Sequence, residues 1–224
     1  FDIERFYNWS LYWDYSTGIS GQLMSHEYDV ANQLMNLGIP HSVIAGGGVY
    51  YYKEKRETPD IFNAVCNFPH KDVSFLYSAT LASNRDRGRL FMGHDGSLDV
   101  GNNLKLTVDR DSLQYAKYIK NKKIIPGQVF YEYRQDTGEV DARTSPTEQY
   151  YASKGLTYTV KNGKRTDVSY LHLKEWLDCI RFGGTPGCDI EKGFETTIAC
   201  HMATKAYREN KKVTWDPVRR RIMS

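Results

Sequence analysis

A series of short β-prone runs, separated by polar turns, constrains the fold of this chain more than any other feature of its sequence. The runs predict strands over residues 42–52, 61–68, 73–82, 89–92, 97–100, 105–108 and 129–134. The turns at 67–72 and 94–96 are short and polar. Consecutive strands joined by such turns pair antiparallel, because a parallel crossover needs a much longer connection.

Helical periodicity flanks these strands on both sides. Residues 22–37 predict an amphipathic helix, whose apolar face we expect to hold Leu23, Met24, Val30, Ala31, Leu34 and Met35. Residues 171–182 predict a second helix, and Asp189 is a candidate N-cap for a third. Residues 1–15 are rich in aromatic side chains and are expected to be extended and packed, whereas 109–127 are left unassigned. The pattern predicts an α+β fold, with an open, largely antiparallel sheet and helices on one face.

A histidine stands one turn into the first predicted helix. Gly18 and Gly21 precede it and permit backbone conformations that side chains forbid. Gln22, His26, Asp29 and Gln33 fall together as a polar stripe on the side opposite the apolar face. The stripe is either a solvated face or part of a reactive site, since the pKa of a histidine suits proton transfer near neutrality.

Several short motifs, taken in order, resemble the C-terminal domain of Gfo/Idh/MocA-type oxidoreductases, which use NAD or NADP to oxidise or reduce sugars, inositols and related polyols. His26 fits the histidine of the family motif Asp-x-x-x-His, and Gln22 stands where the aspartate is expected. The other matching segments are 46–52, 57–60, 93–98, 177–181, 200–202, 206–208 and 215–217. The resemblance implies that residues 1–224 form a single C-terminal domain that binds substrate and forms oligomers.

The resemblance also implies that the dinucleotide-binding domain is absent from this chain. No Gly-x-Gly-x-x-Gly follows a strand, so there is no Rossmann domain here, and Gly46-Gly47-Gly48 leads into β-prone residues that supply no helix N-terminus. We interpret these glycines as a bulge or a site of close backbone approach. NAD or NADP is therefore expected in the full-length protein and not on this chain, which alone should be inactive.

The implied catalytic residues are His26, as the acid–base group, and Gln22, which can form hydrogen bonds but carries no charge. Asp14, Tyr15, Asp29 and His172 are candidate substrate-binding residues, and the first three are candidates to replace the missing carboxylate. A structural role is the alternative to a functional one for both His172 and His201. No residue is assigned to a cofactor or a metal.

Composition limits the partners of the chain. The 224 residues are 40% hydrophobic and 25% charged, which is typical of a folded protein, and the net charge of +3 requires no nucleic-acid partner. We interpret Arg219-Arg220-Arg221 as a solvated tail. The four cysteines form no Cys-x-x-Cys pair, which indicates neither a zinc site nor a disulfide framework.

No apolar run is long enough to span a membrane, and a cytoplasmic location is expected unless an export signal has been removed. Because the chain opens at Phe1, we expect a fragment or a processed product. The expected partners are a small carbohydrate or polyol and further copies of the chain, bound through the outer sheet face. Some rings of Tyr50, Tyr52, Phe62, Phe75 and Tyr77 should point outward there. The alternative function is a non-catalytic carbohydrate-binding or assembly module.

Overall fold

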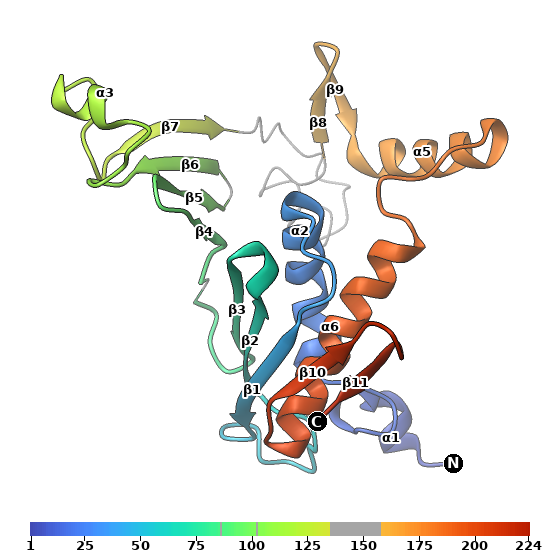
Figure 1. Cartoon of the computed structure of the whole chain (residues 1–224). Helices are drawn as coiled ribbons and strands as arrows, with labels where there is room; N and C mark the ends of the chain where they lie inside the picture. Colours follow the sequence, from blue (N-terminus) through green and yellow to red (C-terminus); the bar gives the residue numbers. More distant parts are fainter. Residues whose placement is uncertain (86, 102, 135–157) are drawn as a thin grey trace. The chain divides into compact units, whose positions relative to one another are not determined.

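A computed structural model of the chain describes residues 1–85, 87–101, 103–134 and 158–224 (Figure 1). These residues divide into two compact units, one formed by Phe1–Asn84 with Gly187–Ser224 and the other by Arg85–Pro186. Both contain helices and antiparallel strands, which confirms the α+β fold class. The single-domain expectation stays a prediction.

The first unit is a five-stranded antiparallel sheet with helices packed against it. Its strands are β1 (Ser42–Gly48), β2 (Ile61–Phe68), β3 (Val73–Thr80), β10 (Val213–Asp216) and β11 (Arg221–Met223), in the order β11-β10-β1-β2-β3. Its helices are α1 (Ile3–Tyr7), α2 (Ser25–Met35) and α6 (Ile190–Glu209), with 3-10 turns η1 (Trp9–Leu11) and η3 (Pro69–Lys71) and a π-helical turn η2 (Ser20–Met24). Helices α2 and α6 lie side by side, and α6 packs on β1 (Figure 1).

The second unit contains a separate four-stranded antiparallel sheet in the order β4-β5-β6-β7, formed by β4 (Leu90–Met92), β5 (Gly96–Val100), β6 (Asn103–Val108) and β7 (Val129–Arg134). It also contains α3 (Ala116–Lys120), the hairpin β8 (Tyr158–Lys161) to β9 (Lys164–Asp167), and α5 (Val168–Phe182). The seven predicted strands are all present within three residues of their predicted ends, except that β1 stops at Gly48, and they are shared between two sheets. The segment 109–127, unassigned from the sequence, contains α3.

The core of the first unit lies between β1, β2 and the helices. Phe62, Ala64, Cys66 and Phe68 alternate along β2 and are buried, and Tyr28 of α2 packs edge-on against Phe75, with ring centroids 5.3 Å apart. Of the five rings of which some were expected to point outward, Tyr50 and Tyr52 are exposed but lie beyond the end of β1, whereas Phe62 and Tyr77 are buried and Phe75 is half-buried. The antiparallel register pairs Cys66 with Phe75 and Ala64 with Tyr77, which places these side chains on the buried face.

The outer face of this sheet carries a narrower apolar strip. Ile44, Val65 and Leu76 are direct cross-strand neighbours on β1, β2 and β3, and Leu76 is 73% exposed. Asn and Ser side chains flank this strip and bond each other across the strands, as Ser74 Oγ does to Asn67 Oδ1 at 2.9 Å. The outer face is therefore partly polar.

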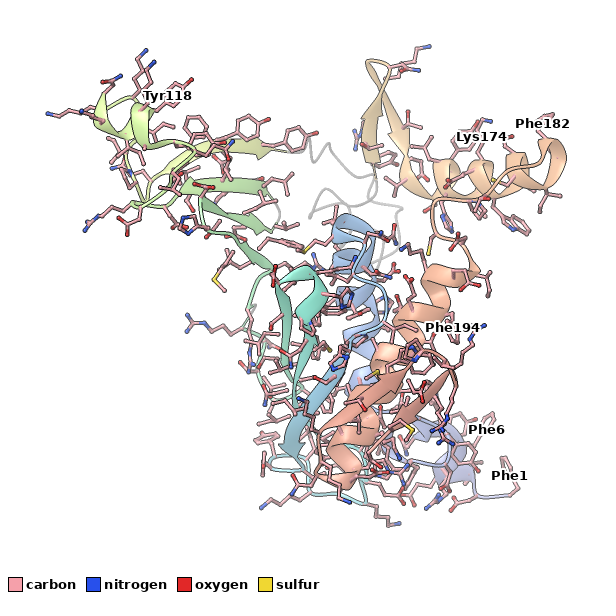
Figure 2. The ribbon with its side chains drawn as sticks, in the orientation of Figure 1. Phe1, Phe6, Tyr118, Lys174, Phe182 and Phe194 are labelled. Atoms are coloured by element: carbon pink, nitrogen blue, oxygen red, sulfur yellow. The ribbon has the colours of Figure 1, made fainter. Side chains whose placement is uncertain are left out.

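The expectation for residues 1–15 was also wrong. The segment forms α1 and η1, because the Asp2 side chain accepts hydrogen bonds from the backbone N–H groups of Glu4 and Arg5 and caps a short helix. Phe1 and Phe6 project outward from this helix (Figure 2), and only Tyr12 of the aromatic residues in the segment is buried.

The buried face of the first predicted helix agrees with the expected one only in part, at Met24 and Ala31, and Val30 is half-buried. Met24, Tyr28, Ala31 and Asn32 are buried, whereas Leu23, Leu34 and Met35 are exposed. The polar side chain of Asn32 can be buried because both ends of its amide form hydrogen bonds. Its Nδ2 donates to Glu195 Oε2 at 2.9 Å, and its Oδ1 accepts from Gly38 N at 2.8 Å. Asp189 caps α6, as predicted, by accepting from Lys192 N.

The buried carboxylate of Asp60 ends strand β1 earlier than predicted. It accepts hydrogen bonds from the backbone N–H groups of Tyr50, Tyr51 and Tyr52 at 2.7–3.0 Å, which turns residues 50–52 out of the strand. Burial alone would raise the pKa of Asp60, but these three donors and the nearby Arg56 outweigh it and lower the pKa below its ordinary value.

We expect Asp60→Asn to reduce the free energy of unfolding by about 2–4 kcal/mol at neutral pH, because an amide cannot replace a charged acceptor for three buried donors. Since the folded-state pKa is lowered, the contribution of Asp60 is full above the ordinary aspartate range and is lost as the pH falls below about 4. Urea unfolding at pH 7 and pH 3.5 measures this. Asp72→Asn is the control, since Asp72 is exposed and its left-handed backbone suits asparagine. An equal loss at both pH values would contradict the prediction.

Candidate functional site

The loop that precedes α2 is tied to the residues between β1 and β2. The backbone N–H groups of Glu57 and Thr58 both donate to the carbonyl of Leu11, at 2.8 and 3.1 Å, and Thr58 Oγ1 donates to the carbonyl of Ser10. Trp13 N donates to Glu57 Oε2 at 2.9 Å. Residues 10–13 are therefore held in place by residues 57 and 58.

A glycine turn then leads into the helix, as the sequence predicted. Gly18 has φ +63°, and a Cβ built on it would lie 3.0 Å from the Cβ of the fully buried Thr58. Gly21 does not have a positive φ, but a side chain there would overlap Thr17 Oγ1. The chain continues through η2 into α2, so the helix begins at Ser20 and ends at Met35.

The Gln22 side chain is half-buried and is bonded to the loop that precedes α2. Its Nε2 donates to Ser16 Oγ at 2.9 Å, and the same hydroxyl oxygen accepts from Gly18 N. A hollow of about 420 Å³ opens at this point. It is lined by Trp9, Trp13, Asp14, Tyr15, Ser16, Thr17, Gly21 and Gln22, so the fold brings three of the predicted site residues, Asp14, Tyr15 and Gln22, to one place. We call it the site hollow.

His26 lies one turn beyond Gln22, exposed, and does not line the site hollow. Within the described part of the chain its imidazole has no hydrogen-bond partner, so it is available to a ligand. Asp29 is engaged elsewhere, because its carboxylate accepts from Gln33 Nε2 at 2.6 Å and from Thr196 Oγ1 at 3.4 Å. Asp14 forms an ion pair with Arg5. Gln22, Asp29 and Gln33 of the stripe all form side-chain hydrogen bonds, which distinguishes them from His26 among the described residues.

Two further histidines named from the sequence, His172 and His201, also lie outside this hollow. His172 lies on α5 in the second unit and is exposed. His201 lies on α6 and lines a second, larger hollow of about 880 Å³, which sequence reasoning missed. Its walls are Trp13, Ser16, Thr17, Ile198, His201, Thr204, Lys205, Arg208, Glu209, Trp215, Arg220, Arg221 and Ile222. We call it the basic groove; its one signal in the sequence was the run Arg219-Arg220-Arg221.

The thiols offer no nucleophile in the first unit's core. Burial raises the pKa of the Cys66 thiol, and it raises that of Cys200 to about 12. Across residues 1–85, 87–101, 103–134 and 158–224, no three histidine, cysteine or carboxylate side chains group so that they could hold a metal ion. In the same residues no helix combines the length and apolar character needed to cross a membrane.

The three glycines Gly46-Gly47-Gly48 do not cradle a phosphate. They lie within and at the end of β1, in unbroken register with β2, and a side chain at Gly47 would collide with the carbonyl oxygen of Ile61. No helix follows them. This confirms close backbone approach, without a bulge, and these three glycines do not form a cradle for a pyrophosphate.

A comparison with protein families gives a match that covers nearly the whole chain. The family model described as "Oxidoreductase family, C-terminal alpha/beta domain" (GFO_IDH_MocA_C) matches residues 3–215. A comparison with curated proteins found no match.

Among solved structures, the chain is similar to the WlbA dehydrogenases of Bordetella pertussis and Chromobacterium violaceum, each in complex with NADH and UDP-GlcNAcA. The TM-scores are 0.57 and 0.56 at 14% and 15% identity, over 93% and 94% of this chain and 51% and 49% of those chains. An NAD-binding protein from Listeria innocua gives 0.55 at 11% identity, over 92% of this chain and 54% of that one. These likenesses show a shared fold, and this chain spans about half the length of each structure.

We expect Gly18→Ala to destabilise the first unit by about 1–2 kcal/mol, because the left-handed backbone is strained for alanine and its Cβ would press on Thr58. Thermal and urea unfolding measure the loss. Gly193→Ala is the matched control: this glycine lies in α6 with open space around its Cβ, so the same change should stabilise by about 0.5–1 kcal/mol. Equal effects of the two substitutions would show that the Gly18 turn is not constrained.

Proposed function

Since this chain belongs to the Gfo/Idh/MocA oxidoreductase family, as its C-terminal alpha/beta domain, we propose that it is the substrate-side half of an NAD- or NADP-dependent oxidoreductase acting on a sugar, inositol or related polyol. The observation that carries the proposal is the exposed, unengaged imidazole of His26 beside a hollow lined by Asp14, Tyr15 and Gln22. The NADH and UDP-GlcNAcA of the two WlbA complexes support it.

In this proposal the work of the chain is to hold the substrate and move a proton. NAD or NADP, when bound, would supply or accept the hydride, and no residue of this chain is proposed to hold it. When a carbinol is oxidised, its hydroxyl proton passes to an imidazole nitrogen of His26, and in the reverse direction the imidazole returns it. Hydroxyl groups of the substrate can bond the side chains of Tyr15 and Gln22, both of which line the site hollow. His172 remains a proposed substrate ligand on the second unit.

Gln22 has a different task from the carboxylate of the family motif. Its amide is bonded to Ser16 Oγ, and it brings no charge to the imidazole. It fixes the loop at Ser16 and Thr17, which forms the wall of the site hollow. This observation also favours the second candidate function, a non-catalytic carbohydrate-binding or assembly module, in which the hollow binds a sugar without turnover.

We further propose that copies of the chain associate through the outer face of the five-stranded sheet. The apolar strip of Ile44, Val65 and Leu76 supports this, because three adjacent aliphatic side chains on neighbouring strands gain by leaving water. An interface of this kind normally buries more than about 1,000 Å².

In the complete oxidoreductase, we expect His26→Ala to lower turnover by about 10² to 10⁴, because the carbinol loses its proton acceptor. The assay follows reduced nicotinamide absorbance over a panel of sugars and polyols. His70→Ala, which changes an exposed histidine on η3, is the control and should leave turnover unchanged. Gln22→Asp tests whether a carboxylate at the motif position raises activity or moves its pH profile.

Unchanged turnover in folded His26→Ala would remove this histidine from the mechanism. Sugar binding by the unmodified protein without turnover of any substrate would favour the binding module instead.

We expect the chain to be a dimer or tetramer at micromolar concentration, and Leu76→Asp to shift it to monomer, since a buried aspartate in the interface would lack a partner. Light scattering gives the mass. Leu34→Asp is the matched control, because Leu34 is similarly exposed but lies on α2. A strictly monomeric mass for the unmodified chain would contradict association through the sheet.

A further inference from the structure

We propose that the basic groove binds a phosphoryl or diphosphoryl group of the substrate, so that the polyol or sugar handled by this protein is a phosphorylated one. This inference rests on the proposed function for the identity of the reacting end of the substrate. The groove itself belongs wholly to the first unit, between the loop before α2, the C-terminal half of α6, and β10 and β11.

The charge of the groove is strongly unbalanced. Lys205 and Arg208 come from α6, Arg220 from the turn before β11 and Arg221 from the start of β11, whereas Glu209 is the one carboxylate in the lining. A hydrogen bond from Lys205 lowers the pKa of Glu209, so that pair is internally neutral. Among the described residues, no carboxylate lies within ion-pair distance of the groove arginines Arg208, Arg220 and Arg221. Their charge is left for a ligand.

Aromatic rings hold two of these guanidinium groups in place. Arg208 lies over the ring of Trp13, 5.0 Å from its centroid, and Arg220 lies over the ring of Phe194 at 4.8 Å. Phe194, on α6 (Figure 2), in turn packs edge-on against Trp215, with ring centroids 6.3 Å apart. A guanidinium stacked on a ring keeps its N–H edge open, and that edge matches the oxygens of a phosphate.

The turn before β11 is also built to a fixed shape. Asp216 Oδ1 accepts from the backbone N–H groups of Val218 and Arg219, each at 3.0 Å, and Arg220 follows with φ +48°. Arg221 then pairs in register with Asp216. Of the three consecutive arginines, Arg220 and Arg221 line the groove, whereas Arg219 lies outside it with its Nε 3.9 Å from Asp216 Oδ2. All three arginines are exposed, as expected of a solvated segment, but the run lies in an ordered turn and at the start of β11 and not in a tail.

The groove and the site hollow share a wall. Trp13, Ser16 and Thr17 line both, and Gln22, on the hollow side, is bonded to Ser16. The two hollows are therefore adjacent. We infer that one substrate places its carbinol in the site hollow and its charged end in the basic groove. The groove volume, about 880 Å³, falls in the range that small ligands occupy.

The test is titration calorimetry of the full chain with inorganic pyrophosphate at constant ionic strength. We expect saturable binding, weakened at least about tenfold by Arg208→Gln and by Arg220→Gln, the size expected for losing a hydrogen bond between charged groups. Arg219→Gln is the matched control: it removes the same charge from the same run outside the groove and should change the affinity less than about twofold. Circular dichroism confirms folding of each variant.

Three outcomes would overturn the proposal. The first is an absence of saturable binding. The second is an equal loss of affinity in Arg219→Gln, which would indicate attraction to net charge alone. The third is displacement of pyrophosphate by NADH, which would assign the groove to the cofactor. His26→Ala should bind pyrophosphate normally. Pyrophosphate affinity therefore tests the groove proposal, and turnover separately tests the proposed reaction.

Discussion

The four residues Glu57, Thr58, Pro59 and Asp60 hold both loops that shape this molecule's site. On one side, Glu57 and Thr58 bind the backbone of Ser10, Leu11 and Trp13, and the Thr58 side chain lies against Gly18. On the other side, the buried carboxylate of Asp60 collects the backbone N–H groups of residues 50–52. Because the same short segment leads into β2, the position of the loop before α2 is fixed by the sheet itself. The site hollow depends on that loop.

The parts of the fold that the sequence predicted are those whose signals are local. Strands β2 and β7 and the N-cap Asp189 were correctly located, because β-prone composition, turn residues and a capping side chain act over a few positions. The two short strands β10 and β11 escaped prediction, since three or four residues become a strand only by pairing with β1 and with each other. The direction of Phe62, Phe75 and Tyr77 likewise depends on register, which no single segment specifies.

The same distinction between local and long-range signals explains which candidate site residues could be named from the sequence. Gln22 and His26 lie four residues apart on one helix, and so a motif could locate them. Asp14 and Tyr15 come together with Gln22 only through the turn at Gly18, yet they were close enough in sequence to be named. The basic groove was missed because its walls come from residues 13–17, 198–209 and 215–222, and it takes the packing of α6 beside β10 to bring them together.

The charges around the two hollows point to the kind of ligand that this surface accepts. The carboxylates near the site hollow are already engaged: Arg5 binds Asp14 and Glu57, and Gln33 and Thr196 bind Asp29. At the motif position a neutral amide stands in place of a carboxylate and is bonded to Ser16. The unengaged charges are cationic and lie along the adjoining groove. The open guanidinium groups of the groove repel cations and attract anions, because only an anionic partner offsets the desolvation of a guanidinium.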